Sequence, residues 1–250
     1  MRIIGYSALL YGADFLNHAI RSIIDDVEEY IVLYSPVGSH GHRTSLPCPD
    51  TREDLYAIAL HAAGDKLRWF DGEWPYEGAQ RDSIFQIAPD ADAIVVLDAD
   101  EIHPPGFIRS AIEATQDSGV RDVRLPFTHF WRSMKRAILR DPAYPVRIIY
   151  PRNPVGTSTT FTPDQSLPIL ERSVLHYGYS QRSEIVRYKL ETHGHKAEIR
   201  RDCDWFNDIF MNTERTTDLH LVGSDAWNWE PVDVPAFMQD HPYANLEIIP

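Results

Sequence analysis

The stretch AIVVLDADE, residues 93–101, decides how we expect this chain of 250 residues to fold. Its first five residues are apolar, as is typical of a strand buried on both faces of a parallel sheet. Asp98, Asp100 and Glu101 follow directly, and because side chains alternate along an extended chain, Asp98 and Asp100 should share one side of the sheet edge. Carboxylates at such an edge indicate either a site for a divalent cation or a solvated turn, since acidic residues are common in both.

Strand and helix patterns alternate around this stretch in the first half of the chain. Strand patterns cover residues 3–8, 30–34, 67–70 and 93–97, and helix patterns cover residues 15–24, 51–63, 77–88 and 107–115. Thr51 and Asp54 have the spacing of a capping box at the start of the second helix. The alternation predicts a parallel sheet, and such sheets bind ligands beyond the carboxyl ends of their strands.

The pattern changes after about residue 120. Short apolar runs interrupted or bounded by prolines predict an antiparallel extension, followed by a polar loop that is a candidate lid, a strand and a helix. These segments are residues 123–131 and 146–150, the loop 153–166, the strand 174–178 and the helix 183–192. We therefore expect a single domain with a ligand-binding half at 1–118, a β-rich half at 119–200 and a C-terminal extension at 201–250.

The composition narrows the class of protein. The chain is 43% hydrophobic and carries 37 acidic against 24 basic residues, a net charge of −13, so nucleic acid is an unlikely partner. No apolar run approaches the roughly 18 residues of a membrane span. Cys48 and Cys203 are too few and too far apart to indicate a disulfide framework or a zinc site. These features lead us to expect a soluble, cytoplasmic protein.

Three segments together resemble GT-A fold glycosyltransferases of the broad family 2 type. They are the N-terminal strand and helix at 3–24, the block GAQRD at 78–82 leading into LDADE at 97–101, and HYGY at 176–179. The resemblance implies a mixed central sheet flanked by helices, with a β-rich acceptor half. It also implies transfer of a sugar from a nucleotide-diphosphate donor to a hydroxyl acceptor, with inversion and with Mn²⁺ or Mg²⁺ as cofactor.

The same resemblance assigns residues to the site. The metal ligands would be Asp98, Asp100 and His176, and the donor-binding residues would be Ser7, Gln80, Arg81, Asp98 and Lys189. Carboxylate oxygens and a neutral imidazole suit these cations, and a basic side chain suits a diphosphate. Arg182 and Arg187 lie on the same expected helix as Lys189. Each assignment has a structural alternative without a role in binding: His176 could be a packed histidine, and Arg81 could be a surface arginine.

An inverting transferase needs a carboxylate to accept the proton of the acceptor hydroxyl. The resemblance places this base in the loop before His176, where Asp164 is the first candidate and Glu171 the second. The second strand ends in Leu33, Tyr34, Ser35 and Pro36, where many relatives carry an aspartate that reads the base, so the identity of the nucleobase stays open.

Two other functions remain compatible with this sequence. A sugar-phosphate nucleotidyltransferase also uses an acid pair at a strand end, although residues 5–9 lack the Gly-rich loop of that class. A degenerate transferase domain would bind a nucleotide or carbohydrate without turnover. Two His-x-His pairs, His40 with His42 and His193 with His195, lack a third ligand at a recognisable spacing.

Overall fold

The structure is a computed structural model that describes residues 1–38, 41–139, 144–153, 156–192, 196–222 and 227–250. Its helices are α1 (Ala13–Ile23), α2 (Arg52–Ala63), α3 (Glu77–Asp82), α4 (Ile84–Ile87), α5 (Phe107–Thr115) and α6 (Ser183–Thr192), with shorter helical turns at Gly64–Lys66, Ile169–Glu171, Lys196–Glu198 and Ala236–Met238 and a π-helix at Trp205–Phe210. Its strands are β1 (Ile3–Leu9), β2 (Glu29–Tyr34), β3 (Leu67–Asp71), β4 (Ala93–Val96), β5 (Glu101–Ile102), β6 (Asp122–Arg124), β7 (Phe127–Trp131), β8 (Arg136–Ile138), β9 (Val146–Ile149), β10 (Ser158–Thr160), β11 (Val174–Tyr179) and β12 (Glu230–Pro231).

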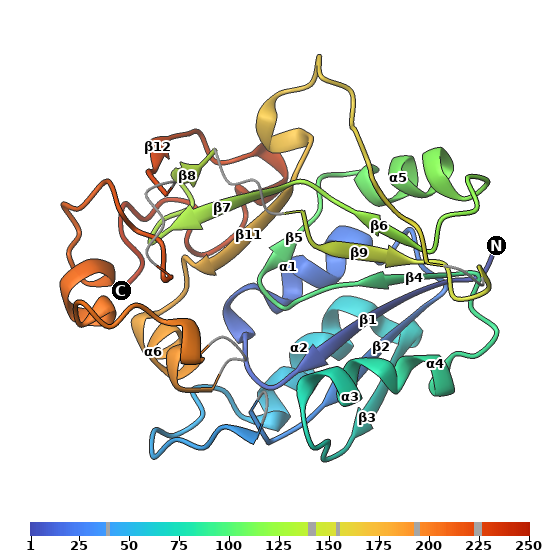
Figure 1. Ribbon diagram of the computed structural model, residues 1–250, viewed down its shortest axis with the longest axis horizontal. Coiled ribbons are helices and arrows are strands. Elements are labelled where there is room, and N and C mark those ends of the chain that lie inside the picture. Colours follow the sequence, from blue (N-terminus) through green and yellow to red (C-terminus); the bar gives the residue numbers. More distant parts are fainter. Residues whose placement is uncertain (39–40, 140–143, 154–155, 193–195, 223–226) are drawn as a thin grey trace.

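A seven-stranded mixed sheet runs through the molecule in the order β10-β6-β9-β4-β1-β2-β3 (Figure 1). The strands β3, β2, β1 and β4 are parallel, as the βαβ alternation predicts. The strand β9 enters antiparallel between β4 and β6. The mixed α/β class expected from the sequence is confirmed, and the two halves expected from the sequence share this one sheet.

Each face of the parallel part packs against its own helices. Tyr30 and Val32 of β2 lie in the core cluster that includes residues of α1, α2 and α5, whereas Ile31 and Leu33 lie in the cluster that includes Ile84 of α4. The alternation follows from the pleat, which sends successive side chains to opposite faces. Burial on both faces explains why these strands read as continuous apolar runs.

A second sheet has five strands in the order β12-β8-β7-β11-β5. Its first strand along the chain, β5, starts at Glu101, the last residue of the acidic stretch. The strand β4 belongs to the first sheet and β5 to the second, so Asp98 and Asp100 lie in the link between the two sheets. Within the second sheet, His176 of β11 pairs with Glu101 of β5 in antiparallel register. This pairing brings residues about 75 positions apart in the sequence to one place.

Several elements differ from the sequence-based prediction. The expected helix 77–88 is divided at Ser83 into α3 and α4, and the expected strand 123–131 is divided into β6 and β7, which join different sheets. Pro126 stands at that division, where its missing N–H cannot continue a ladder. The described part of the expected loop 153–166 contains β10, which pairs with β6.

The C-terminal part of the chain adds a third core cluster beside α6 and β7. Trp131, Trp205, Phe210 and Trp227 are all buried in it. Among the described residues, none of the helices has both the length and the apolar content needed to cross a membrane.

Candidate functional site

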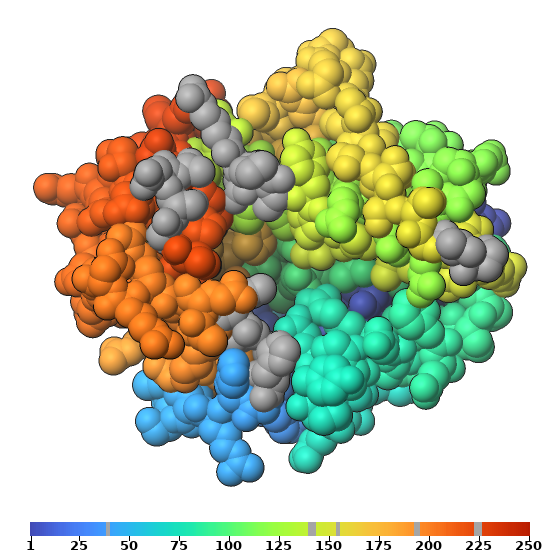
Figure 2. All heavy atoms as spheres, in the orientation of Figure 1, coloured from blue at the N-terminus to red at the C-terminus, as the bar shows by residue number. Residues whose placement is uncertain are grey.

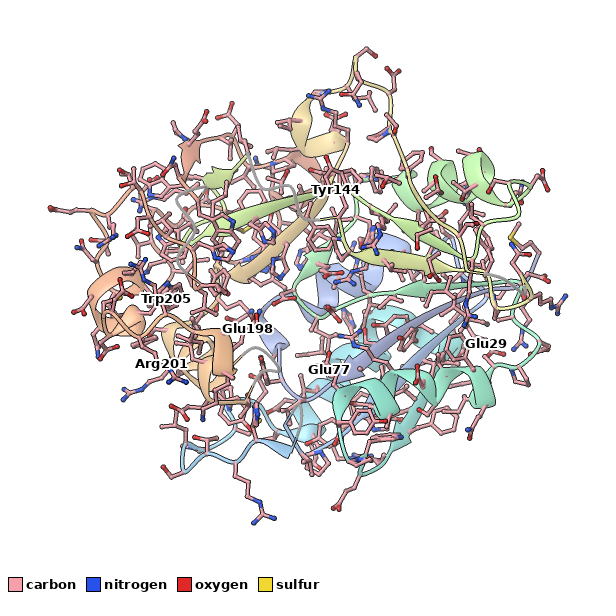
Figure 3. All side chains as sticks on the ribbon, viewed as in Figure 1. Glu29, Glu77, Tyr144, Glu198, Arg201 and Trp205 are labelled. Atoms are coloured by element: carbon pink, nitrogen blue, oxygen red, sulfur yellow. The ribbon has the colours of Figure 1, made fainter. Side chains whose placement is uncertain are left out.

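A cavity of about 780 Å³ opens where the carboxyl end of β1 meets the link between β4 and β5. Its walls come from α3 on one side and from β11, α6, Glu198 and residues 220–222 on the other. Figure 2 shows the surface hollowed between the teal α3 region and the orange α6 region. Glu77 and Glu198, both cavity-lining residues, lie on opposite sides of it (Figure 3). The cavity therefore has the position expected for a ligand site in a sheet of this kind.

Asp98 is held by two guanidinium groups. Arg81 of α3 donates from Nη2 to Oδ1 at 2.8 Å, and Arg147 of β9 donates from Nη2 to Oδ2 at 3.0 Å. Arg81 also contacts Glu77 one turn earlier on its helix, at 2.7 Å. Burial alone would raise the pKa of Asp98, but Arg81 and Arg147 reverse this and keep it well below its usual range. Asp98 is therefore ionised at any physiological pH.

Glu101 and Asp98 are both partners of the Arg147 guanidinium group. Arg147 Nε donates to Glu101 Oε2 at 2.7 Å, and Nη2 contacts the other carboxylate oxygen. Burial raises the pKa of Glu101 to about 7, although Arg147 acts to lower it. Neither Glu101 nor Arg147 lines the cavity, and Glu101 holds the guanidinium group that contacts Asp98.

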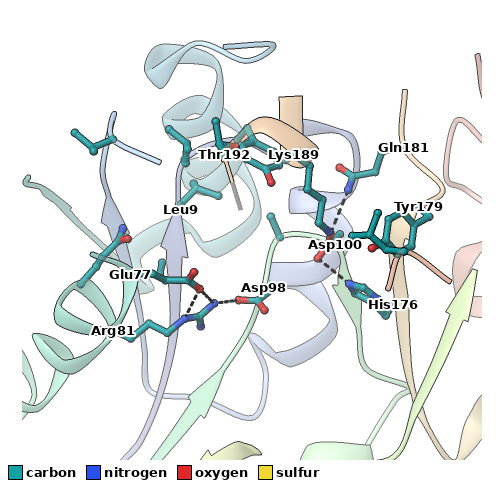
Figure 4. A pocket seen from close by; sticks show the side chains of 18 of the residues that line it. Leu9, Glu77, Arg81, Asp98, Asp100, His176, Tyr179, Gln181, Lys189 and Thr192 are labelled. Carbon is teal, nitrogen blue, oxygen red and sulfur yellow. Dashed lines mark hydrogen bonds and ion pairs between the residues drawn. The ribbon is translucent and has the colours of Figure 1, made fainter. Parts of the chain in front are cut away.

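Asp100 forms a second cluster on the other side of the cavity (Figure 4). Its Oδ2 accepts hydrogen bonds from Lys189 Nζ and Gln181 Nε2, both at 3.1 Å. Its Oδ1 faces His176 Nε2 at 3.7 Å. Burial acts to raise the pKa of Asp100, but Lys189 and His176 lower it overall, so this carboxylate is also ionised.

His176 is oriented by a second histidine. Nδ1 of His176 and Nδ1 of His129 on β7 lie 2.6 Å apart, so one of them donates to the other and Nε2 of His176 is directed at Asp100. Burial lowers the pKa of His176 to about 3, against the influence of Asp100, and the imidazole is therefore neutral. A Cβ at Gly178 would lie 2.6 Å from His176 Nε2 and 2.8 Å from Lys189 Nζ. Glycine at this position thus leaves room for both side chains.

Two further contacts position the elements around the cavity. Gly12 has a φ of +122°, and a Cβ there would lie 2.6 Å from the Cβ of Ala99, the residue between the two aspartates. Arg182, at the start of α6, donates to Asp14 at 2.7 Å and to Asp50 at 3.0 Å. Arg182 therefore ties α6 to the beginning of α1 and does not face the cavity.

Most of the expected site residues line this cavity. Asp98, Asp100, His176, Arg81, Gln80 and Lys189 do so. Gln80 also donates to the carbonyl of Leu33 at 2.7 Å. Ser7 lies outside the lining, fully buried in β1, where it donates to the carbonyl of Leu97 at 2.6 Å.

The two expected general bases lie elsewhere. Asp164 is exposed and accepts a hydrogen bond from Ser166 N at 2.9 Å, which is the geometry of an Asx-turn. Glu171 is exposed in the following helical turn, and neither residue lines the cavity. Their role as base stays a prediction. Of the His-x-His pairs, His40, His193 and His195 lie outside the described residues.

Sequence reasoning missed Arg147, Gln181 and Glu198. Arg147 interrupts the apolar run of β9 between Val146 and Ile148, and a charged residue in such a run is a sign of a buried partner. Gln181 and Glu198 follow β11 and α6 without any pattern around them, so no signal in the sequence marks them.

The donor set fits a divalent cation in part. Asp100 Oδ1 and His176 Nε2 converge, and Asp98 is close by, but in the part of the chain that the structure describes no three His, Cys, Asp or Glu side chains are grouped so that they could hold a metal ion. Mg²⁺ commonly takes one or two protein ligands and completes its coordination with substrate phosphates. The residues therefore fit an ion held jointly by the protein and a phosphate-bearing ligand.

Comparisons with known proteins do not show a family for this chain. No protein-family model matches the chain, and no curated protein is significantly similar to it. Among solved structures, it is similar to a mycobacterial protein at 20% identity and a TM-score of 0.39, over 51% of this chain and 41% of that one. It is also similar to glucosyl-3-phosphoglycerate synthase from Mycobacterium tuberculosis in complex with Mg²⁺ and UDP, at 18% identity and a TM-score of 0.38, over 51% and 43% of the two chains.

A further structure of that synthase holds Mn²⁺, UDP-glucose and phosphoglyceric acid. It matches at 18% identity and a TM-score of 0.37, over 52% of this chain and 44% of the synthase. The chain thus covers less than half the length of these solved chains.

Proposed function

We propose that this chain is a GT-A type glycosyltransferase that moves a sugar from a nucleoside diphosphate donor to a hydroxyl group of an acceptor. The observation that carries the proposal is the convergence of two carboxylates, an imidazole and two side-chain cations on one cavity at the carboxyl end of the parallel strands. These residues are Asp98, Asp100, His176, Arg81 and Lys189. This set combines the groups that bind a divalent cation with those that bind phosphate oxygens.

The proposed roles follow from position. Arg81 and Lys189 face the cavity from opposite walls and supply positive charge for the diphosphate, with Gln80 behind Arg81. Asp100 and His176 would hold Mn²⁺ or Mg²⁺, and Asp98 would contact the ion or the ribose. When bound, the ion supplies positive charge to the departing diphosphate.

The acceptor hydroxyl requires a base in a direct displacement that inverts the anomeric carbon. Asp164 and Glu171 take this role in the proposal only if the loop that carries them approaches the cavity. Glu198 already lines the cavity wall opposite α3, which makes it a third candidate.

Binding without turnover is a second candidate function. The observation that favours it is the exposure of Asp164 and Glu171 outside the cavity. A chain of this kind would hold a nucleotide or a nucleotide sugar and release it unchanged.

Turnover distinguishes the two candidates. We would measure release of nucleoside diphosphate from a panel of nucleotide sugars with Mn²⁺ and simple hydroxyl acceptors. We expect one donor to be consumed, with the rate reduced about 100-fold or more in Asp100→Asn, because loss of one charge-stabilising group at a reacting centre has an effect of this size. Asp65→Asn, an exposed acid outside the cavity, is the matched control.

The other outcomes are equally informative. Nucleotide-sugar binding without turnover would reject the transferase function and support the second candidate, a domain that binds without turnover. Absence of both binding and turnover would reject a donor site in this cavity.

A further inference from the structure

Lys189 is held against Asp100 as a fixed ion pair. The side chains of Lys189 and Asp100 are 20% and 12% exposed, and Nζ lies 3.1 Å from Oδ2. Nζ also lies 5.5 Å from the centre of the Tyr179 ring, and the absence of a Cβ at Gly178 leaves room for it. An exposed lysine would sample many rotamers, whereas this one is confined to the wall of the cavity.

The position of Lys189 matters because of where a divalent cation would have to bind. Such a cation at Asp100 Oδ1 would stand near an ammonium group that already neutralises the same carboxylate. Like charges at this distance in a partly buried site repel each other strongly. A metal ion alone is therefore opposed by Lys189.

A diphosphate alone meets the opposite difficulty. Among the described residues that line the cavity, four are carboxylates and two are lysine or arginine: Glu77, Asp98, Asp100 and Glu198 against Arg81 and Lys189. The cavity is thus more negative than positive before a diphosphate enters, and both of its cations are already paired with aspartates. To bind Lys189, the diphosphate must separate it from Asp100, and to bind Arg81 it must compete with Asp98, which Arg147 also contacts.

From these two points, and resting on the proposed function, we infer that the divalent cation and the diphosphate bind cooperatively through exchange of Lys189. Lys189 occupies Asp100 when neither ligand is present. When both arrive, the ammonium group transfers from Asp100 to a phosphate oxygen, and the metal ion takes its place at the carboxylate. Lys189 is therefore a residue that couples the two ligands and also contacts the donor.

Binding of Mn²⁺ to the full chain tests this inference. We would titrate Mn²⁺ by calorimetry into the parent, Lys189→Met and Lys189→Arg, each alone and with saturating UDP or, in a separate series, GDP. Removing the ammonium should tighten Mn²⁺ binding alone by about 10-fold, and the enhancement of Mn²⁺ affinity by nucleotide should shrink by a similar factor, a range usual for coupled sites. Lys189→Arg keeps the charge and should leave Mn²⁺ alone weakly bound.

Lys196→Met is the matched control, because Lys196 belongs to the next helical turn and pairs with Glu191 outside the cavity. Thermal unfolding provides a second readout: Mn²⁺ should raise the melting temperature of Lys189→Met more than that of the parent. Mn²⁺ affinity in Lys189→Met equal to or weaker than that of the parent, with nucleotide still bound, would overturn the inference and leave the proposed function standing. If the parent binds neither UDP nor GDP, the series is repeated with ADP, CDP and dTDP, and failure of the parent and every variant to bind any of the five, with or without Mn²⁺, would overturn both.

Discussion

Arg147 is the residue that both Asp98 and Glu101 share as a partner. It contacts Asp98 at the cavity and Glu101 below it, and the side chains of Arg147 and Glu101 are 12% and 1% exposed. A buried carboxylate without its partner is costly, because neither water nor another cation can replace the guanidinium. The site therefore depends on a residue that lies 49 positions from Asp98 and belongs to no motif.

We predict that Arg147→Met lowers the free energy of unfolding by about 3 kcal/mol, since Glu101 and Asp98 lose a buried partner and the pKa of Glu101, which Arg147 acts to lower, rises further above that of the unfolded chain. Urea denaturation near neutral pH measures the loss. The double variant Arg147→Met with Glu101→Gln should recover a large part of it, because no carboxyl group then has to take up a proton at this position on folding. Lys196→Met, which breaks the exposed pair with Glu191, is the control and should cost no more than about 1 kcal/mol. Equal losses in Arg147→Met and Lys196→Met would contradict this account.

His241 links the end of the chain to α1 in a protonation-dependent manner. Its ring stacks on Phe15, its Nδ1 accepts from Tyr243 N at 3.1 Å, and its Nε2 lies 3.0 Å from the carbonyl of Asp14. These contacts require the neutral tautomer with the proton on Nε2. A second proton on Nδ1 would face the N–H of Tyr243, and burial lowers the pKa of His241 to about 4.

This shift predicts a loss of stability in weak acid. Between pH 6.5 and about 4 the unfolded chain binds a proton at this residue and the folded chain does not, so stability falls as the pH decreases through this window and levels off below it. The contribution of His241 between pH 7 and pH 5 is roughly 2 kcal/mol. Denaturation at both pH values should show a smaller pH-dependent loss in His241→Leu than in the parent or in His61→Leu, an exposed histidine of α2. The same pH dependence in all three proteins would contradict the prediction.

At the scale of elements, the turn before α1 supports the link that carries the aspartates. Gly12 has a left-handed φ, and a Cβ there would overlap Ala99, whereas Gly119 has a φ of +74° with no atom within 4 Å of such a Cβ. We predict that Gly12→Ala destabilises the fold more than Gly119→Ala, whose cost should be about 1 kcal/mol from backbone strain alone. Gly12→Ala should also weaken nucleotide binding, because the shift of Ala99 moves Asp98 and Asp100. Similar losses for the two variants, with nucleotide binding unchanged, would show that the contact with Ala99 is unimportant.

The longer helices and strands could be predicted from the sequence, and the shortest strands could not. Strands β1 to β4 and helices α1, α2, α5 and α6 were predicted, because apolar periodicity is a local signal that survives in long segments. Strands β5, β8, β10 and β12 are two or three residues long. Strands β5, β10 and β12 pair with strands distant in the sequence, and β8 lies between its neighbour β7 and the distant β12. Pro126 was visible in the sequence, but the passage of the chain into a second sheet at that point depends on tertiary packing.

For the site, the structure brings together those predicted residues that follow a recognisable strand end or segment, and their roles stay predictions. Asp98, Asp100, His176, Arg81 and Lys189 were expected and do line one cavity. Arg147 could not be placed with them, because its contacts join strands that a sequence does not show to be neighbours.

At the scale of the whole molecule, the cavity shares the acidic balance of the chain. The net charge is −13, and the described lining of the cavity contains more carboxylates than side-chain cations. Two sheets meet at the acidic link, so that groups from β1, the link itself, β11, α3 and α6 face one space. Under the proposed function, an anionic ligand enters this space together with a metal ion.

The central claim is that this cavity binds a nucleoside diphosphate together with a divalent cation. Calorimetric titration of the parent and of Asp100→Ala with UDP, GDP, ADP, CDP and dTDP, each with and without Mn²⁺, tests it most directly. We predict that one diphosphate binds the parent more tightly with Mn²⁺ and that this gain disappears in Asp100→Ala but not in Asp65→Ala. Binding of none of the five, or a gain from Mn²⁺ that persists in Asp100→Ala, would contradict the claim.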